Sequence, residues 1–110
     1  MTEKKERIAA LNDRLRQMFE GGHVLITPGI QALNPAQLEE IRKAVQGFDE
    51  FNADNDPHRE RDFGIVKMEG IGSVYWKIDY YDLTMQYGSE DPSDPEQTTR
   101  VLTIMLSHEY

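Results

Sequence analysis

The side chains best suited to do chemistry lie in one run, from Tyr75 to Asp82, which holds the only tryptophan and three of the five tyrosines. In an extended strand, successive side chains point to opposite faces. One face then carries four polar or aromatic side chains, which are Tyr75, Lys77, Asp79 and Tyr81. The other face is apolar around Trp76 and is predicted to join a core. The first face is therefore a predicted binding surface.

On that face, the Cα atoms of Lys77 and Asp79 are expected to be about 6.5–7 Å apart, so the two side chains can share one site. A lysine between a carboxylate and phenols can act as a general acid–base group or anchor an anion. Together with Asp62, which directly precedes the strand predicted before this one, these residues are the catalytic candidates. The alternative is an ion pair of Lys77 with Asp79 or Glu69, worth about 1 kcal/mol or less if exposed.

A second run places a metal-ligand type of side chain at every second residue: Asp54, Asp56, His58, Glu60 and Asp62. In an extended segment these side chains would face one side, and carboxylates with one imidazole suit a hard or borderline divalent cation. An EF-hand is excluded, because Arg59 and Ile65 stand where its loop needs Gly and Glu. The last four are the metal candidates. A solvated acidic loop is the commoner meaning of such a run, so we favour no cofactor and keep a divalent cation as the alternative.

Arg100 follows a loop rich in aspartate and proline and is predicted to open the last strand. A guanidinium there can bind a carboxylate or phosphate through two parallel hydrogen bonds, which makes Arg100 a further binding candidate. The interpretation we prefer is that Arg100 holds the acidic loop in place through Asp91 or Asp94.

The composition is that of an acidic chain without cysteine. Its 110 residues predict a single domain over residues 1–110, and its net charge is −8. Such a charge disfavours direct binding to nucleic acid and suits a protein partner. Without cysteine there are no disulfides or thiolate metal sites, and no apolar stretch suits a membrane helix. We therefore expect a cytoplasmic protein, with a homodimer as one further option.

Hydrophobic periodicity and turn signals divide the chain into helices followed by strands. Helices are predicted over 2–20, ended by Gly21-Gly22, and over 34–47, where Asn34 and Gln37 form a capping box. Strands are predicted over 23–27, 63–69, 73–82 and 99–108, with a turn at 28–29 and polar loops at 48–62 and 83–98. The last strand, apolar on both faces, should be central. We expect an α+β fold in which two helices, the N-terminal one and Asn34–Gly47, pack with an antiparallel β-sheet of three to four strands arranged as a meander.

Longer motifs carry a resemblance to a known family. They are Thr27-Pro28-Gly29-Ile30, Asn55-Asp56-Pro57, Asp62-Phe63-Gly64, Lys77 to Asp82, Asp91 to Pro95, Arg100 to Leu106 and Glu109-Tyr110. Over nearly the whole chain, from the Asn12-Asp13 region onward, the sequence resembles the bacterial domain-of-unknown-function family 3768 (DUF3768). The resemblance implies a small stand-alone protein of proteobacteria, often encoded on plasmids or other mobile elements, with no established activity. Arg61 stands where the family pattern has a histidine after Glu60, which speaks against a catalytic role for that histidine.

Two functions are compatible with these observations. The first is a protein-interaction or regulatory module of a plasmid or other mobile element that binds through the tyrosine-rich sheet face. The second is a small enzyme or divalent-metal-binding module whose Asp, Glu and Lys side chains converge on the hairpin of residues 62–82. The sequence holds no known catalytic signature, so we favour the first.

Overall fold

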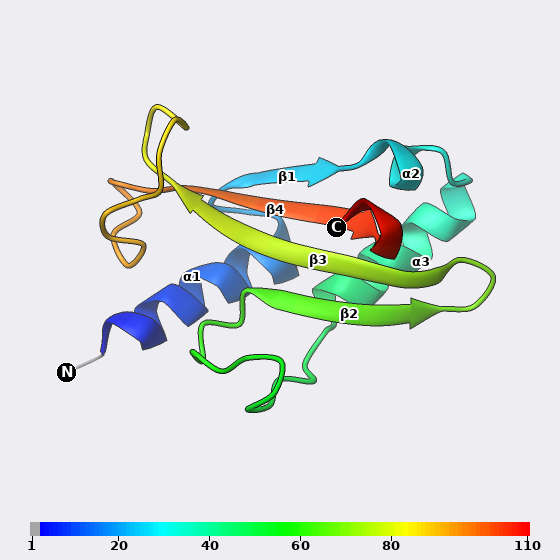
Figure 1. Cartoon of the computed structure of the whole chain (residues 1–110), viewed down its shortest axis with the longest axis horizontal. Helices are drawn as coiled ribbons and strands as arrows, with labels where there is room; N and C mark the ends of the chain where they lie inside the picture. Colours follow the sequence, from blue (N-terminus) through cyan, green and yellow to red (C-terminus); the bar gives the residue numbers. More distant parts are fainter. Residues whose placement is uncertain (1–2) are drawn as a thin grey trace.

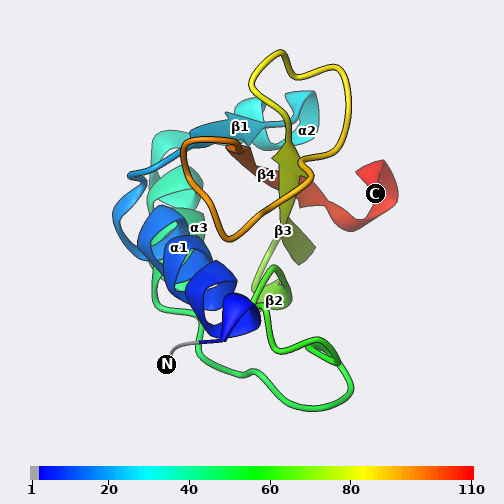
Figure 2. The same ribbon diagram turned by 90° about the vertical axis from the view of Figure 1, so that its left-hand side faces the viewer.

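The structure is a computed structural model that describes residues 3–110. One four-stranded sheet lies against two longer helices, which share the same face of the sheet (Figures 1 and 2). The helices are α1 (Lys4–Met18), α2 (Pro28–Gln31) and α3 (Pro35–Gln46), followed at the C-terminus by the 3₁₀ turn η1 (Ser107–Glu109). The strands are β1 (His23–Ile26), β2 (Phe63–Met68), β3 (Gly72–Tyr81) and β4 (Thr99–Leu106). The predicted α+β class is confirmed.

The strand order is β1-β4-β3-β2. Strands β2, β3 and β4 are antiparallel neighbours, as the predicted hairpin requires, and β4 is central as expected. Strand β1 pairs with β4 in parallel, so the prediction of an antiparallel meander is wrong for this strand. The reason is that the chain leaves β1 through α2 and α3 and returns much later, which lets β1 lie beside a strand far away in sequence.

Local signals explain where the helices begin and end. Asn34 accepts a hydrogen bond from the backbone of Gln37 at 2.8 Å, and the Gln37 side chain accepts one from the backbone of Asn34 at 3.1 Å, so the predicted capping box is present. Helix α1 ends where Phe19 takes a left-handed conformation, two residues before the glycine pair expected to end it. Residues 28–29, expected to be a turn, open the short helix α2. Thr2, where the first helix was predicted to begin, lies outside the described residues.

The core lies between the helices and one face of the sheet. Trp76 is fully buried there, and the rings of Phe48 and Phe51 meet it edge-on at 5.5 and 6.1 Å between ring centres. The two phenylalanines thereby attach the 48–62 loop to the core. Alternation in β3 thus points Trp76 toward the helices and sends Lys77 to the opposite face, which α1 and α3 leave uncovered.

Candidate functional site

The uncovered face of the sheet carries a groove with a volume of about 620 Å³. Strands β3 and β4 lie side by side beneath it, with Lys77 opposite Thr103 and Asp79 opposite Val101. The lining also takes residues from β1, from the segment after β3 and from the C-terminus: Leu25, Thr27, Lys77, Asp79, Tyr81, Met85, Val101, Thr103, Met105, Glu109 and Tyr110. We call this hollow the open-face groove. Three of the four residues of the predicted binding surface line it.

Tyr75, the fourth residue of that surface, lies in an aromatic row at the end of the groove. Its ring meets Phe63 at 5.7 Å and Tyr110 at 5.4 Å between ring centres, both edge-on. The row joins β2, β3 and the C-terminus. Edge-on contact is one of the arrangements that aromatic pairs prefer, and the row places the exposed Tyr110 ring beside the groove.

Lys77 and Asp79 form an ion pair, with 2.9 Å between Nζ and Oδ2. The hydrogen bond that Lys77 donates to Asp79 is the largest influence on Lys77 and raises the pKa of the ammonium above its ordinary value. A lysine held protonated in this way is not a general base at neutral pH. Because both side chains are more than a third exposed, the pair contributes about 1 kcal/mol or less to stability.

Glu109 fastens the C-terminal turn to the segment that follows β1. Its Oε1 accepts hydrogen bonds from Thr27 Oγ1 at 2.6 Å and from the backbone of Leu106 at 2.9 Å, and its Oε2 accepts one from the backbone of Gly29 at 3.0 Å. These bonds, that from Thr27 first, keep the pKa of the carboxyl below its ordinary value. A Cβ atom on Gly29 would lie 2.7 Å from Oε1, so only glycine allows this approach.

Several groove residues were missed by the sequence reasoning. The alternation used for β3 also applies to β4, where it puts Val101, Thr103 and Met105 on one face, and this signal was available. No local pattern marks Leu25 or the C-terminal Tyr110 as members of the same surface, because their proximity depends on how β1 and η1 pack against the sheet.

Asp62 lies away from this groove. Its backbone carbonyl accepts a hydrogen bond from Ile78 at 2.8 Å, and its charge acts on Tyr80, which faces the helices. Burial, followed by the charge of Glu60, raises the pKa of Asp62 above its ordinary value. Its ionisation in the folded state therefore opposes folding at neutral pH, and this cost falls as the pH drops. The sheet separates Asp62 from Lys77 and Asp79.

The segment with the metal candidates is not extended. Residues 53–59 form turns, and Arg59 and Arg61 have positive φ values of 58° and 54°. The expectation that alternate side chains would face one side is therefore wrong, because left-handed residues break the alternation. Asp56 accepts a hydrogen bond from the backbone of Arg61 at 3.0 Å, whereas His58 is exposed. Within residues 3–110, no group of three or more His, Cys, Asp or Glu side chains lies close enough to hold a metal ion.

A buried polar network joins α1 to the sheet on the helix side. Asn12, on α1, donates to the Tyr80 hydroxyl at 2.8 Å and accepts from Nε of Arg100 at 2.9 Å. The Tyr80 hydroxyl in turn donates to Glu60 at 2.9 Å. Burial raises the pKa of Tyr80 and lowers that of Arg100. The Tyr80 hydroxyl therefore stays protonated and acts as a donor. Because the helices cover the network, we assign it a structural role.

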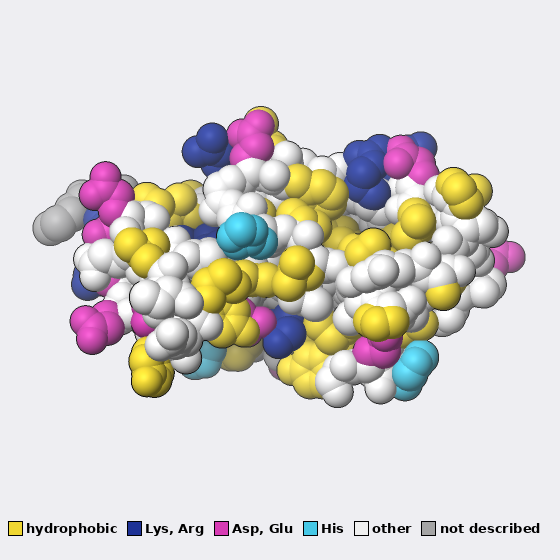
Figure 3. All heavy atoms as spheres, turned by 90° about the horizontal axis from the view of Figure 1, so that it is seen from above, with side chains coloured by type: hydrophobic (Ala, Val, Ile, Leu, Met, Phe, Trp, Pro, Cys, Tyr) yellow, Lys and Arg dark blue, Asp and Glu magenta, His cyan; other side chains and the backbone are white. Residues whose placement is uncertain are grey.

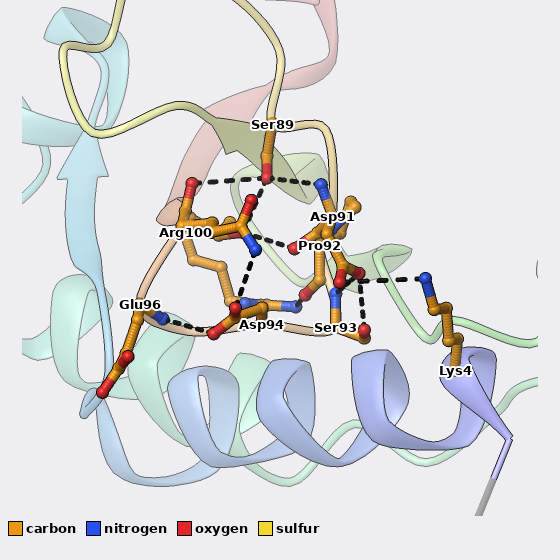
Figure 4. A network of polar contacts seen from close by, with 10 residues as sticks. Lys4, Ser89, Asp91, Pro92, Ser93, Asp94, Glu96 and Arg100 are labelled. Atoms are coloured by element: carbon orange, nitrogen blue, oxygen red, sulfur yellow. Dashed lines mark hydrogen bonds and ion pairs between the residues drawn. The ribbon is translucent and has the colours of Figure 1, made fainter.

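Arg100 holds the acidic loop, as the preferred interpretation proposed, but through a different group. Its guanidinium donates to the backbone carbonyl of Pro92 and not to the carboxylates of Asp91 or Asp94 (Figure 4). Asp91 instead accepts from Ser93 and lies 3.8 Å from Lys4 of α1. Arg100 is 2% exposed and lies on the helix side, so it takes no part in the open-face groove.

Metal addition is expected to leave the melting temperature unchanged within about 1 °C in 1 mM Mn²⁺, Zn²⁺ or Ca²⁺ compared with EDTA, because the carboxylates of the 54–62 segment are dispersed. A site with a Kd of about 10 µM would add about 2.7 kcal/mol at that concentration, which a thermal melt detects. A shift with one metal that disappears in the Asp62→Asn variant would contradict this prediction and establish a metal site.

The chain matches the model of a known protein family. A family model described as "Protein of unknown function (DUF3768)" matches residues 26–109, which includes β1 in part and all later elements but not α1. No curated protein and no solved structure matches the chain. No helix in residues 3–110 has the length and apolar character that spanning a membrane requires.

Proposed function

We propose that this chain, which belongs to the DUF3768 family of proteins of unknown function, is a protein-interaction module that docks a partner in its open-face groove. The observation that carries the proposal is the groove itself: an uncovered sheet face hollowed to about 620 Å³, in which six of the eleven lining residues are apolar or aromatic. Surfaces of this kind are typical of binding sites, because burying them removes apolar area from water.

The residue types in the groove also support docking of a protein. Tyr and Met are enriched in the cores of protein interfaces, and Tyr81, Tyr110 and Met85 line this groove with half-buried or exposed side chains, whereas Met105 beneath them is buried. The ion pair there, Lys77 with Asp79, offers a donor and an acceptor to a partner's polar groups. Because most of the lining stands on paired strands, little ordering cost is expected on binding.

The alternative, an enzyme or a divalent-metal-binding module on the 62–82 hairpin, has less support. It requires Asp62 to work with Lys77 and Asp79, yet Asp62 interacts with Glu60 and Tyr80 on the helix side. The raised pKa of Lys77 also disfavours its use as a base.

The biological setting that we propose follows the family resemblance: a regulator or inhibitor encoded on a bacterial plasmid or other mobile element, acting in the cytoplasm on a host or plasmid protein. The net charge of −8 makes nucleic acid an unfavourable partner. It also disfavours a second copy of the chain, since two acidic molecules repel.

Replacing both Lys77 and Asp79 by alanine is expected to weaken partner binding while changing the free energy of unfolding by about 1 kcal/mol or less, because the pair is exposed. Binding is measured by photo-crosslinking in a lysate of the source bacterium, with benzoylphenylalanine in place of Tyr81. The expected result is a discrete adduct that fades in the Lys77→Ala/Asp79→Ala background.

The matched control carries the photo-crosslinker at Glu40, an exposed position of α3 on the helix side. The same adducts from Glu40 and from Tyr81 would mean that the groove has no special part in binding. An adduct made of two copies of this chain would mean that the groove forms a homodimer and does not bind a foreign partner.

A further inference from the structure

The segment between β3 and β4 exposes three large apolar side chains at its tip. Leu83 is 65% exposed, Met85 47% and Tyr87 72%. We call these three residues the apolar tip. Met85 borders the open-face groove, whereas Leu83 and Tyr87 border a second hollow of about 390 Å³. The tip is thus a continuation of the groove past the end of β3.

The apolar tip is held in an ordered turn. Asp82 Oδ1 accepts hydrogen bonds from the backbones of Thr84 at 3.1 Å and Gln86 at 3.2 Å, and the backbone of Asp82 donates to Tyr87 at 2.8 Å. Tyr81 and Gly88 then form a β-bridge that closes the turn. Holding apolar side chains exposed to water does not stabilise the isolated fold. A preformed apolar surface does, however, lower the entropy cost of ordering these side chains when a partner binds.

The segment that carries the tip is acidic in sequence. Residues 78–99 contain no Lys, Arg or His, and their six acidic side chains are Asp79, Asp82, Glu90, Asp91, Asp94 and Glu96. The second hollow is lined by Asp82, Glu90 and Glu96 besides the two apolar residues of the tip. In the view from above, acidic and hydrophobic side chains, with some Lys or Arg, lie at the left end of the molecule, where this segment and the start of α1 lie (Figures 1 and 3).

Four of these six carboxylates form no ion pair within residues 3–110, namely Asp82, Glu90, Asp94 and Glu96. Of these, Glu90 and Glu96 are exposed. Asp91, by contrast, lies near Lys4. The negative charge of the second hollow repels anions and attracts cations. A partner surface without positive charge would leave this negative charge unpaired in the complex.

We propose that the apolar tip and the second hollow bind a segment of the partner protein that presents Lys or Arg beside an apolar side chain. The apolar side chain packs on Leu83 and Tyr87, and the cation lies between Glu90 and Glu96. This inference rests on the proposed function, since it names the chemistry of the partner that the groove receives. Charge complementarity selects this occupant over a second copy of the acidic chain.

The probe is a synthetic hexapeptide that alternates lysine and leucine, titrated into the ¹⁵N-labelled full chain and followed by amide chemical shifts. The expected result is a saturable shift of amides within residues 82–97. The Glu90→Gln/Glu96→Gln variant is expected to bind about fivefold more weakly, and Leu83→Ser/Tyr87→Ser about tenfold more weakly. A peptide with glutamate in place of lysine should cause no saturable shift.

The matched control is Glu40→Gln/Glu69→Gln, which removes two exposed carboxylates elsewhere and changes the net charge by the same amount. An equal loss of affinity in this control, or equal binding of the glutamate peptide, would overturn the inference. Saturable shifts confined to the groove, at Thr103 and Met105, would overturn it while leaving the proposed function in place. Binding at 82–97 without any Tyr81-specific crosslinked adduct would instead overturn the groove as the docking site.

Discussion

Replacing Asn12 by alanine is expected to lower the free energy of unfolding by about 3 kcal/mol, because it removes hydrogen bonds from a buried charged group. Asn12 is 0% exposed and is the residue through which α1 reaches Arg100 and Tyr80. Without its amide, Nε of Arg100 loses its acceptor inside the core. Urea unfolding followed by the fluorescence of Trp76, the only tryptophan, measures the change.

A double-mutant cycle separates the loss of this bond from a simple loss of volume. An Arg100→Met background has no guanidinium that could lose its acceptor. Asn12→Ala should therefore lower the free energy of unfolding by about 1.5 kcal/mol less there than in the natural chain. Equal costs in the two backgrounds would mean that Asn12 acts through packing alone, which would contradict our account of the network.

The second large effect is expected for Gly64→Ala, which should lower the free energy of unfolding by about 2 kcal/mol through overpacking. A Cβ atom at this position would lie 2.4 Å from Nε1 of Trp76 and 2.8 Å from Cζ of Phe48. Both rings are held in the core and cannot withdraw freely. Urea unfolding again gives the change, and near-UV circular dichroism reports whether the tryptophan has moved.

Gly88→Ala is the matched control, since it makes the same chemical change at the bridge beside Tyr81. The nearest atom to a Cβ there is the Tyr80 carbonyl oxygen at 3.8 Å, an ordinary contact. Its effect should be within about 0.5 kcal/mol. If the two variants were equally destabilised, the cost would come from the loss of glycine itself and not from collision with the Trp76 ring.

Much of the local structure could be predicted from individual residues. The Asn34–Gln37 capping box appears at the predicted place, since a cap requires only residues three apart. The alternation of β3 correctly sent Trp76 inward and Lys77 outward, because a strand reverses its face at every residue. The prediction failed over 54–62, where positive φ at Arg59 and Arg61 replaces the extended backbone that the ligand pattern assumed.

Long-range pairing could not be predicted in the same way. Nothing within His23–Ile26 reveals that its partner is Val101–Ile104, and in parallel. The resemblance named the right family, but no local pattern revealed that Glu109 would fasten the C-terminal turn to Thr27 and Gly29. Such contacts join residues about eighty positions apart, and their formation depends on the packing of the whole sheet.

The sequence by itself thus determined the two-faced character of the run from Tyr75 to Asp82, because that character depends on alternation alone. Only the tertiary structure decided what lies on each side of it. It put Asp62 and Arg100 with the helices, and it surrounded Lys77, Asp79 and Tyr81 with side chains from β1, β4 and the C-terminus. A local pattern sets the direction of a side chain, whereas a groove requires distant segments to meet.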